Sequence, residues 1–213
     1  TTPTPNIRLN VNEKARTVAS VCTSGTLCTV SASDGIQGAP FGSFVDYVLD
    51  GSGNPIFLMN EMSMHTINIQ SNNIVTLFTQ LQEHDNKLGQ DVSRCSITGI
   101  IQKLERTDPD VDLIRMKYSI AHSYADQVMD SPKFDFYRLT PKKIYYVGGF
   151  GVQSQWVEPH DYEVSNPDIL AVFATQMVYK LNRDHYDDLV WVATQLLNIA
   201  TEIEQVRLTS VDR

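Results

Sequence analysis

Apolar and polar residues alternate over short runs in the first half of the chain, and this period of two predicts β-strands. The runs are rich in β-branched and aromatic residues and are separated by turn sequences such as Asp34-Gly35 and Asp50-Gly51. Strands at this spacing favour a closed antiparallel sheet, because closure removes the edges that apolar strands would otherwise expose. The predicted strands are 26–31, 42–49, 55–60, 73–80 and 93–104.

A period near 3.6 residues predicts helices before, between and after these strands. The first covers 12–24, where Ala15, Val18 and Cys22 share one face, and Gly25 follows at a position that glycine favours after a helix. Pro167 falls in the first turn of a later helix. The other predicted helices are 109–123, 166–180 and 184–203, and a polar loop at 131–136 leads into a strand over 138–147.

These elements predict an α+β fold that is mainly β. We expect one barrel domain over 1–165 with flanking helices, and a C-terminal helical extension over 166–213. A length of 213 residues and a hydrophobic content of 42% suffice for one substantial core. The apolar strands would leave a large exposed patch on a monomer, so a homodimer is expected.

Composition excludes several classes of partner. A net charge of −8 and a pI near 5.0 repel a polyanion, so nucleic acid is not an expected partner. No apolar run approaches the roughly 18 to 20 residues that a membrane-spanning helix needs. The first five residues lack the features of a targeting peptide and resemble a trimmed terminus. Cys22, Cys28 and Cys95 have no metal-ligand spacing, so we expect buried free thiols.

Several motifs carry a family resemblance. Four segments resemble the flavin-binding split barrels of the pyridoxamine-phosphate-oxidase-like superfamily: Gly25-Thr-Leu-Cys-Thr-Val30, the run from Gly38 to Tyr47, the run from Asn54 to Asn60, and His65-Thr-Ile-Asn68. Tyr145-Tyr-Val-Gly-Gly-Phe-Gly151 with Trp156, and Leu181-Asn-Arg-Asp-His185, resemble the HugZ-type heme oxygenases and their plant relatives. The resemblance implies a homodimer with a cofactor at each cleft between subunits, and a chloroplast location.

The sequence departs from the flavin-binding pattern at the cations that neutralise the FMN phosphate. Gly42 and Tyr47 replace the Arg and Lys of one strand, and Ser63-Met64-His65 replaces a Ser-Arg-Lys run. A phosphate in a partly desolvated cleft needs charge-assisted hydrogen bonds, so FMN should be held poorly. Nearby Phe and Met side chains suit a large flat macrocycle, although such residues also fill cores. Heme is therefore the expected cofactor and FMN the less favoured one.

The resemblance assigns the candidate site residues. His65 is the candidate catalytic residue, either as a proton donor or as the heme-iron ligand. Water is an equal alternative as the iron ligand. The alternative role for His65 is a structural one, in which its side chain caps a helix or bonds to the barrel. Arg94 could pair with a heme propionate or form a surface salt bridge. The glycines and aromatics of the 148–156 segment would form a rim from the partner subunit, or a tight turn. The candidate cofactor-binding residues are Ser43, Asn60, Ser63, His65, Arg94, Gly149, Phe150 and Trp156.

Three functions remain open at this stage. The leading expectation is a heme-binding protein that supports oxidative heme breakdown with O₂ and a reductant or with H₂O₂. The alternatives are an FMN-dependent oxidoreductase and a non-catalytic regulator of tetrapyrrole synthesis. HugZ-type enzymes draw an iron-ligating histidine from near the C-terminus, and no histidine follows His185 here. His84, His122 and His160 are expected at the surface.

Overall fold

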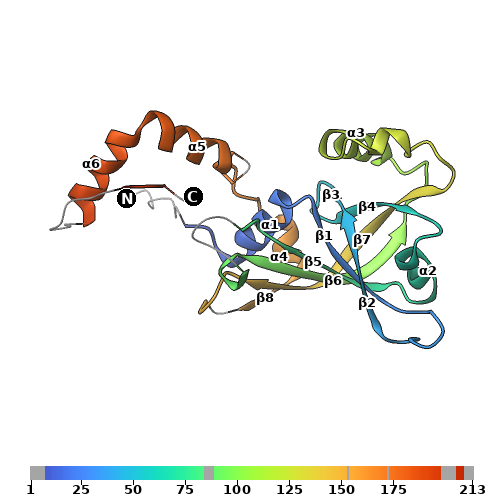
Figure 1. Ribbon diagram of the computed structural model, residues 1–213. Coiled ribbons are helices and arrows are strands. Elements are labelled where there is room, and N and C mark those ends of the chain that lie inside the picture. The colour runs from blue at the N-terminus through green and yellow to red at the C-terminus, as the bar shows by residue number, and fades with distance from the viewer. Residues whose placement is uncertain (1–7, 84–88, 153, 172, 198–204, 209–213) are drawn as a thin grey trace.

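The computed structural model describes residues 8–83, 89–152, 154–171, 173–197 and 205–208. Within these residues, eight strands form one antiparallel sheet that curls into an open barrel, as Figure 1 shows. The strand order is β2-β1-β5-β6-β7-β4-β3, with β8 paired to β7. The expected antiparallel barrel with flanking helices is confirmed. The strands are β1 (Ser24–Val30), β2 (Pro40–Asp46), β3 (Val48–Leu49), β4 (Pro55–Asn60), β5 (Ile74–Gln80), β6 (Arg94–Lys103), β7 (Phe134–Val147) and β8 (Gln155–Val157).

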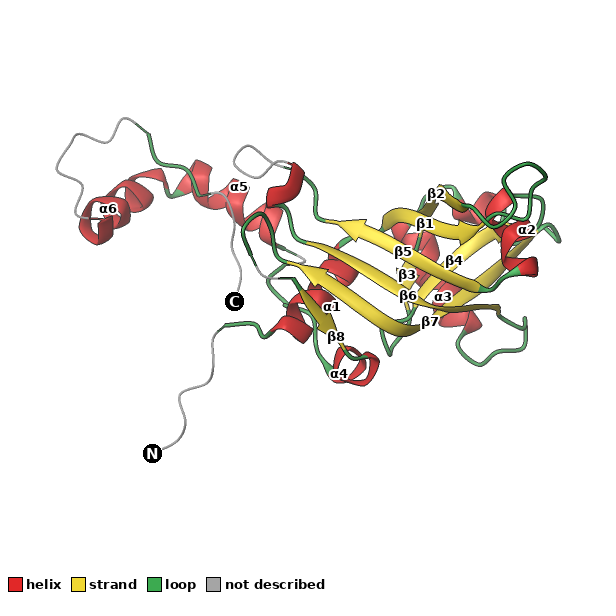
Figure 2. Cartoon of the chain, turned by 90° about the horizontal axis from the view of Figure 1, so that it is seen from below, coloured by secondary structure: helices red, strands yellow, loops and turns green. Residues whose placement is uncertain are grey.

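Helices close the ends of the barrel and extend beyond it (Figures 1 and 2). They are α1 (Val11–Val21), α2 (Met64–Ser71), α3 (Val111–Ala121), α4 (Pro159–Val164), α5 (Ala174–Asp184) and α6 (Tyr186–Leu197), with short 3₁₀ turns η1 (Gly89–Asp91) and η2 (Ala125–Gln127). No helix among the described residues is long and apolar enough to cross a membrane.

The main core lies on the inner face of the sheet. Leu27, Leu77, Ile97 and Ile144 follow one another in register across four strands, and each is fully buried. Burying each such side chain contributes about 1.5–3 kcal/mol. The alternation seen in the sequence places these residues inward, because neighbours along a strand point to opposite faces.

Helix α1 covers one side of this core and ends earlier than predicted. Asn10 and Glu13 form a capping box at its start, with two reciprocal bonds of 2.9 Å. The predicted end at Gly25 is wrong, because the helix stops at Val21 and Gly25 lies in β1. A Cβ at Gly25 would lie 2.4 Å from the backbone oxygen of Phe78, so glycine permits two strands to approach closely.

A row of side chains crosses the opposite face of the sheet. Register pairing aligns the row over β2, β1, β5, β6, β7 and β8. Two of its aromatic side chains are mostly exposed, Phe44 at 73% and Trp156 at 62%. We call this set the outer-face row, and it consists of Phe44, Thr26, Phe78, Ser96, Tyr145 and Trp156.

The segment between β6 and β7 builds a second apolar cluster against β3 and β4. Ile114 and Tyr118 of α3 are buried in it. The prediction of a surface His122 is wrong, because this residue is 7% exposed and its Nε2 lies 3.1 Å from the backbone oxygen of Tyr47. The predicted loop at 131–136 is also too long. Strand β7 begins at Phe134, and its 14 residues include the whole strand that was predicted over 138–147.

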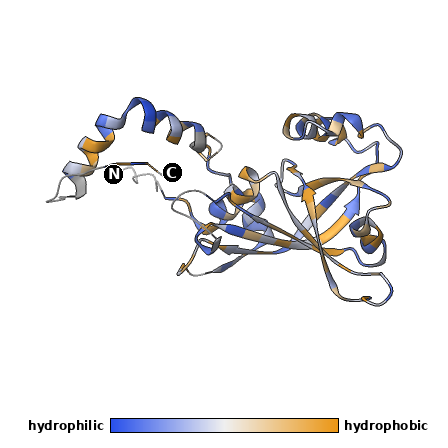
Figure 3. Cartoon of the chain, in the orientation of Figure 1, coloured by the Kyte–Doolittle hydropathy of each residue, from blue (hydrophilic) through white to orange (hydrophobic). Residues whose placement is uncertain are grey.

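The C-terminal region forms two helices in an arm that projects from the barrel (Figures 1 and 2), and Figure 3 shows hydrophilic residues over much of α5. The predicted helix start near Pro167 is wrong. Asp168 is fully buried, its backbone N–H donates to Thr17 Oγ1 at 2.8 Å, and its own carboxylate accepts from Leu170 N at 3.0 Å. These bonds hold 166–170 outside a helix. The end of the predicted 184–203 helix lies outside the described residues. The boundary between a barrel domain over 1–165 and a helical extension over 166–213 stays a prediction.

Candidate functional site

Most of the predicted site residues lie in two separate pockets on the sheet. One pocket, of about 500 Å³, is formed where β4, α2 and the start of β7 meet, and we call it the His65 pocket. The other, of about 450 Å³, lies at the far end of β7, and we call it the Arg94 pocket. The first pocket includes Leu58 and Asn60, which lie on the other face of β4 from the buried Phe57, and the second includes Tyr145 of the outer-face row.

The His65 pocket is mostly apolar. Among the described residues that line it, His65 and Tyr124 are the titratable side chains, and none is Lys or Arg. Its surface therefore suits an apolar ligand with a few polar atoms rather than a phosphate. The lining consists of Leu58, Met59, Asn60, Met62, Ser63, His65, Tyr124 and Phe134.

A rigid turn presents the polar groups of this pocket. The side-chain oxygen of Asn60 accepts from Met62 N at 2.8 Å, and its backbone oxygen accepts from Ser63 N at 3.1 Å and from Thr66 Oγ1 at 2.7 Å. The bond to Met62 leaves the Asn60 amide nitrogen as the free donor. Among the described residues, neither that nitrogen nor Ser63 Oγ has a hydrogen-bond partner in the chain. Both remain available to a ligand.

His65 lies in the first turn of α2 and is half-buried. Its Nδ1 is 3.1 Å from Ser43 Oγ, whereas its Nε2 has no hydrogen-bond partner among the described residues. Burial lowers the pKa of the imidazole below its usual value, so the ring is neutral at pH 7. Ser43 lines neither pocket; it lies on β2 and contacts the pocket only through His65.

Tyr124 is the pocket residue that sequence reasoning missed. Its hydroxyl donates to the Asp46 carboxylate at 2.9 Å, and burial together with this bond raises its pKa to about 12. The backbone oxygen of Asp46 in turn accepts from Tyr118 at 2.8 Å. No local pattern marks Tyr124, because it follows a helix in a polar stretch and reaches the pocket only through tertiary packing.

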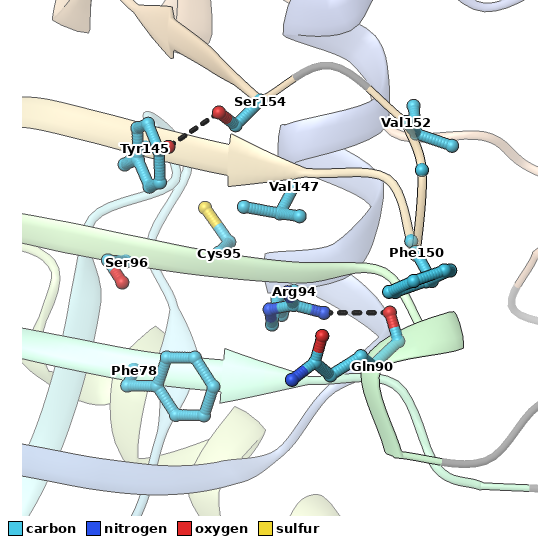
Figure 4. Close-up of a pocket in the computed structure, with 12 residues that line it drawn as sticks. Phe78, Gln90, Arg94, Cys95, Ser96, Tyr145, Val147, Phe150, Val152 and Ser154 are labelled. Atoms are coloured by element: carbon cyan, nitrogen blue, oxygen red, sulfur yellow. Dashed lines mark hydrogen bonds between the residues drawn. The ribbon is translucent and has the colours of Figure 1, made fainter.

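The Arg94 pocket combines one cation with aromatic side chains (Figure 4). Arg94 Nη1 donates to the backbone oxygens of Gln90 at 3.0 Å and Val92 at 3.3 Å. No carboxylate among the described residues lies within ion-pair distance of it. Phe150 is 74% exposed at the rim, beside Gly149. Gly149 has a φ of 142°, and a Cβ there would lie 2.8 Å from Asp91 O.

Trp156 lies near this pocket without lining it. Its ring is 4.7 Å from that of Tyr145, centroid to centroid, and Tyr145 donates to Ser154 Oγ, the contact drawn as a dashed line in Figure 4. The remaining predicted residues divide between the pockets, with Asn60, Ser63 and His65 in one and Arg94, Gly149 and Phe150 in the other.

The two pockets use opposite ends of strand β7. Phe134 lines the His65 pocket and Val147 lines the Arg94 pocket. The sequence predicted one constellation, and the structure separates it into two halves.

Comparisons with known proteins agree with this architecture. In Arabidopsis thaliana, a protein named chloroplastic non-canonical heme oxygenase HOZ is 26% identical, with 92% of this chain and 59% of that protein covered. A chloroplastic glutamyl-tRNA reductase-binding protein from the same plant is 21% identical, with coverage of 94% and 57%. This chain therefore spans less than two thirds of either relative.

A solved structure described as a heme binding protein from Mycobacterium smegmatis has a TM-score of 0.74 and 25% identity, and the match covers 97% of this chain and 81% of that one. The split-barrel superfamily expected from the sequence is confirmed. The model of the CREG β-barrel matches residues 6–164, about three quarters of the chain. The chain belongs to the CREG β-barrel family.

Proposed function

We propose that this protein binds heme in clefts formed between two copies of the chain and supports oxidative breakdown of the heme. The observation that carries the proposal is the His65 pocket. Among its described residues, apolar walls surround a neutral imidazole whose Nε2 has no partner, and no Lys or Arg lines the pocket. A heme has a broad apolar face, and its iron accepts a neutral imidazole nitrogen. The names of the plant heme oxygenase and the mycobacterial heme binding protein support this choice of ligand.

A dimer would unite the two halves of the site. A two-fold axis crossing the outer face near the middle of β7 exchanges the ends of that strand between copies. The His65 pocket of one copy would then face the Arg94 pocket of the other. The exposed Phe44 and Trp156 of the outer-face row give the apolar surface that such an interface would bury.

Each group in the composite cleft has a distinct task. Asn60 and Ser63 would orient polar edges of the ligand, and His65 Nε2 would bind the iron or hold a water beside it. Arg94 from the second copy would pair with a propionate, because it has no carboxylate partner within the described part of the chain. Bound heme would supply the activation of O₂ or H₂O₂, with an external reductant in the first case.

A role in regulation without catalysis is the second candidate. The pocket offers few groups for proton transfer, since the Tyr124 hydroxyl is committed to Asp46 and only His65 remains. The relative named as a reductase-binding protein also favours a binding role. FMN is the weaker ligand, because the His65 pocket has no Lys or Arg for its phosphate. A chloroplast location, suggested by both plant relatives, is part of the proposal.

The test is a hemin titration of the purified protein followed by absorbance, with FMN as the competing ligand. We expect a Soret band that saturates at one heme per subunit, and light scattering that gives a dimer mass. His65→Ala should weaken binding about tenfold, or about 1.4 kcal/mol, if the ring binds iron, while His160→Ala on the exposed face of α4 should not. Loss of the Soret band with ascorbate or H₂O₂ separates catalysis from binding. The absence of a saturable Soret band would refute the proposal.

A further inference from the structure

We propose that Ser43 is a positioning residue that fixes the tautomer of His65, so that Nδ1 carries the ring proton and the Nε2 lone pair faces the pocket. His65 would then act as a hydrogen-bond acceptor or a metal ligand through Nε2, and not as a donor. The inference rests on the proposed function only for the identity of that ligand as heme iron.

Two neighbours compete for the single hydroxyl proton of Ser43. Ser43 of β2 lies opposite Leu27 of β1, and its Oγ is 3.5 Å from the backbone oxygen of Leu27. That carbonyl oxygen can only accept, whereas Nδ1 of a histidine can donate, so both contacts are satisfied together when the hydroxyl proton is directed toward Leu27. The lone pairs of the same oxygen are left for His65 Nδ1 at 3.1 Å. That contact then requires a proton on Nδ1.

The structure around His65 fixes the ring and keeps it neutral. Helix α2 packs against β1, and the bond from Thr66 Oγ1 to Asn60 O at 2.7 Å holds the start of the helix. His65 is half-buried, which disfavours a charged ring, and the positive end of the helix dipole also disfavours an imidazolium in the first turn of α2. A neutral imidazole has one ring proton, so a proton on Nδ1 leaves Nε2 bare.

This tautomer has a chemical consequence for the pocket. Histidines that bind metals commonly donate their second N–H to a neighbouring oxygen, which orients the ring and raises the basicity of the ligating nitrogen. Ser43 Oγ is in the place of that oxygen. The pocket then offers a donor at the Asn60 amide nitrogen and an acceptor at His65 Nε2.

The first experiment needs no heme. Long-range ¹H–¹⁵N correlation of the ¹⁵N-labelled protein near neutral pH identifies which ring nitrogen of His65 carries the proton. We expect Nδ1–H in the wild type and in Ser43→Thr, which keeps the hydroxyl, and a shift toward Nε2–H in Ser43→Ala. Ser71→Ala, at the exposed end of α2, is the matched control and should leave the spectrum of His65 unchanged. An Nε2–H signal in the wild type, or an unchanged tautomer in Ser43→Ala, would overturn the proposal.

The second experiment measures hemin affinity and the Soret maximum of the same proteins. Ser43→Ala should weaken heme binding by about tenfold, within the range found for groups behind a metal ligand, and Ser43→Thr should restore it. If Ser43→Ala binds hemin as the wild type does, the result refutes the role of Nε2 as the iron ligand but not heme binding itself. If the wild type shows the Nδ1–H tautomer and no Soret band, the result refutes the proposed function but supports the role of Ser43.

Discussion

Replacing Gly53 by alanine should destabilise the fold through a buried arginine. Gly53 lies in the turn between β3 and β4 with a φ of +86°, and an added Cβ would lie 0.7 Å from Arg16 Nη1. The guanidinium therefore has to leave its place. Arg16 is 6% exposed, and it joins α1 to this turn and to α4.

The magnitude follows from the contacts that would be lost. Arg16 Nη1 donates to Ser52 O at 2.9 Å, a charged hydrogen bond of about 1.5–3 kcal/mol. Its guanidinium lies 5.0 Å from the centre of the Tyr162 ring, a contact of about 0.5–2 kcal/mol. Alanine in the left-handed conformation adds about 1–2 kcal/mol. We expect a loss of about 3–7 kcal/mol in the free energy of unfolding, a large part of the 5–15 kcal/mol typical of a domain.

Urea denaturation followed by circular dichroism measures this loss, and Gly35→Ala is the matched control. Gly35 has a φ of +81°, but nothing lies within 4 Å of its added Cβ. The control should therefore lose only the backbone contribution, about 1–2 kcal/mol. Equal losses in the two variants would refute the structural role assigned to Arg16.

Three further outcomes are expected. Tyr118→Phe should lower the free energy of unfolding by about 1–3 kcal/mol, measured by urea denaturation, because it removes a buried hydroxyl that donates to Asp46 O and accepts from Leu58 N. Met64→Arg combined with His65→Lys should raise FMN affinity, measured by quenching of flavin fluorescence, because it adds cations beside the pocket; tight FMN binding by the unmodified protein would contradict this. Since burial lowers the pKa of His65 in the folded state, the unfolded chain takes up the proton first, so stability should fall as pH drops below about 6.5. His65→Asn should remove that part of the pH dependence in urea titrations, and an unchanged profile would count against it.

The sequence was most informative where structure is set by near neighbours in the chain. The strand predicted over 55–60 coincides with β4, because alternation and turn residues act within a few positions. The sequence was least informative where a residue far away in the chain sets the local structure or the burial of a side chain. Asp168 was placed in a helix, yet Thr17, far away in the sequence, binds its backbone N–H. His122 was placed at the surface, yet Tyr47 and the α3 cluster bury it.

The candidate site was predictable in its residues and not in its geometry. Family resemblance named His65 and Arg94, but a resemblance carries no information on which pocket each residue enters. Ser43 was expected to line the cleft, whereas its register opposite Leu27 directs it to His65. Tyr124 was missed because its place depends on Asp46 of β2, which lies 78 residues earlier.

The proposed composite cleft can be tested with two variants. In that cleft, one ligand contacts His65 of one copy and Arg94 of the other. A variant altered at His65 and a variant altered at Arg94 would therefore each damage both clefts of their own dimers. In a mixed dimer, however, both changes fall in the same cleft, and the other cleft keeps both groups. If the site is shared between copies, mixing the two variants should therefore restore heme binding in half of the clefts of the mixed dimer. If the site lies within one chain, mixing should restore none.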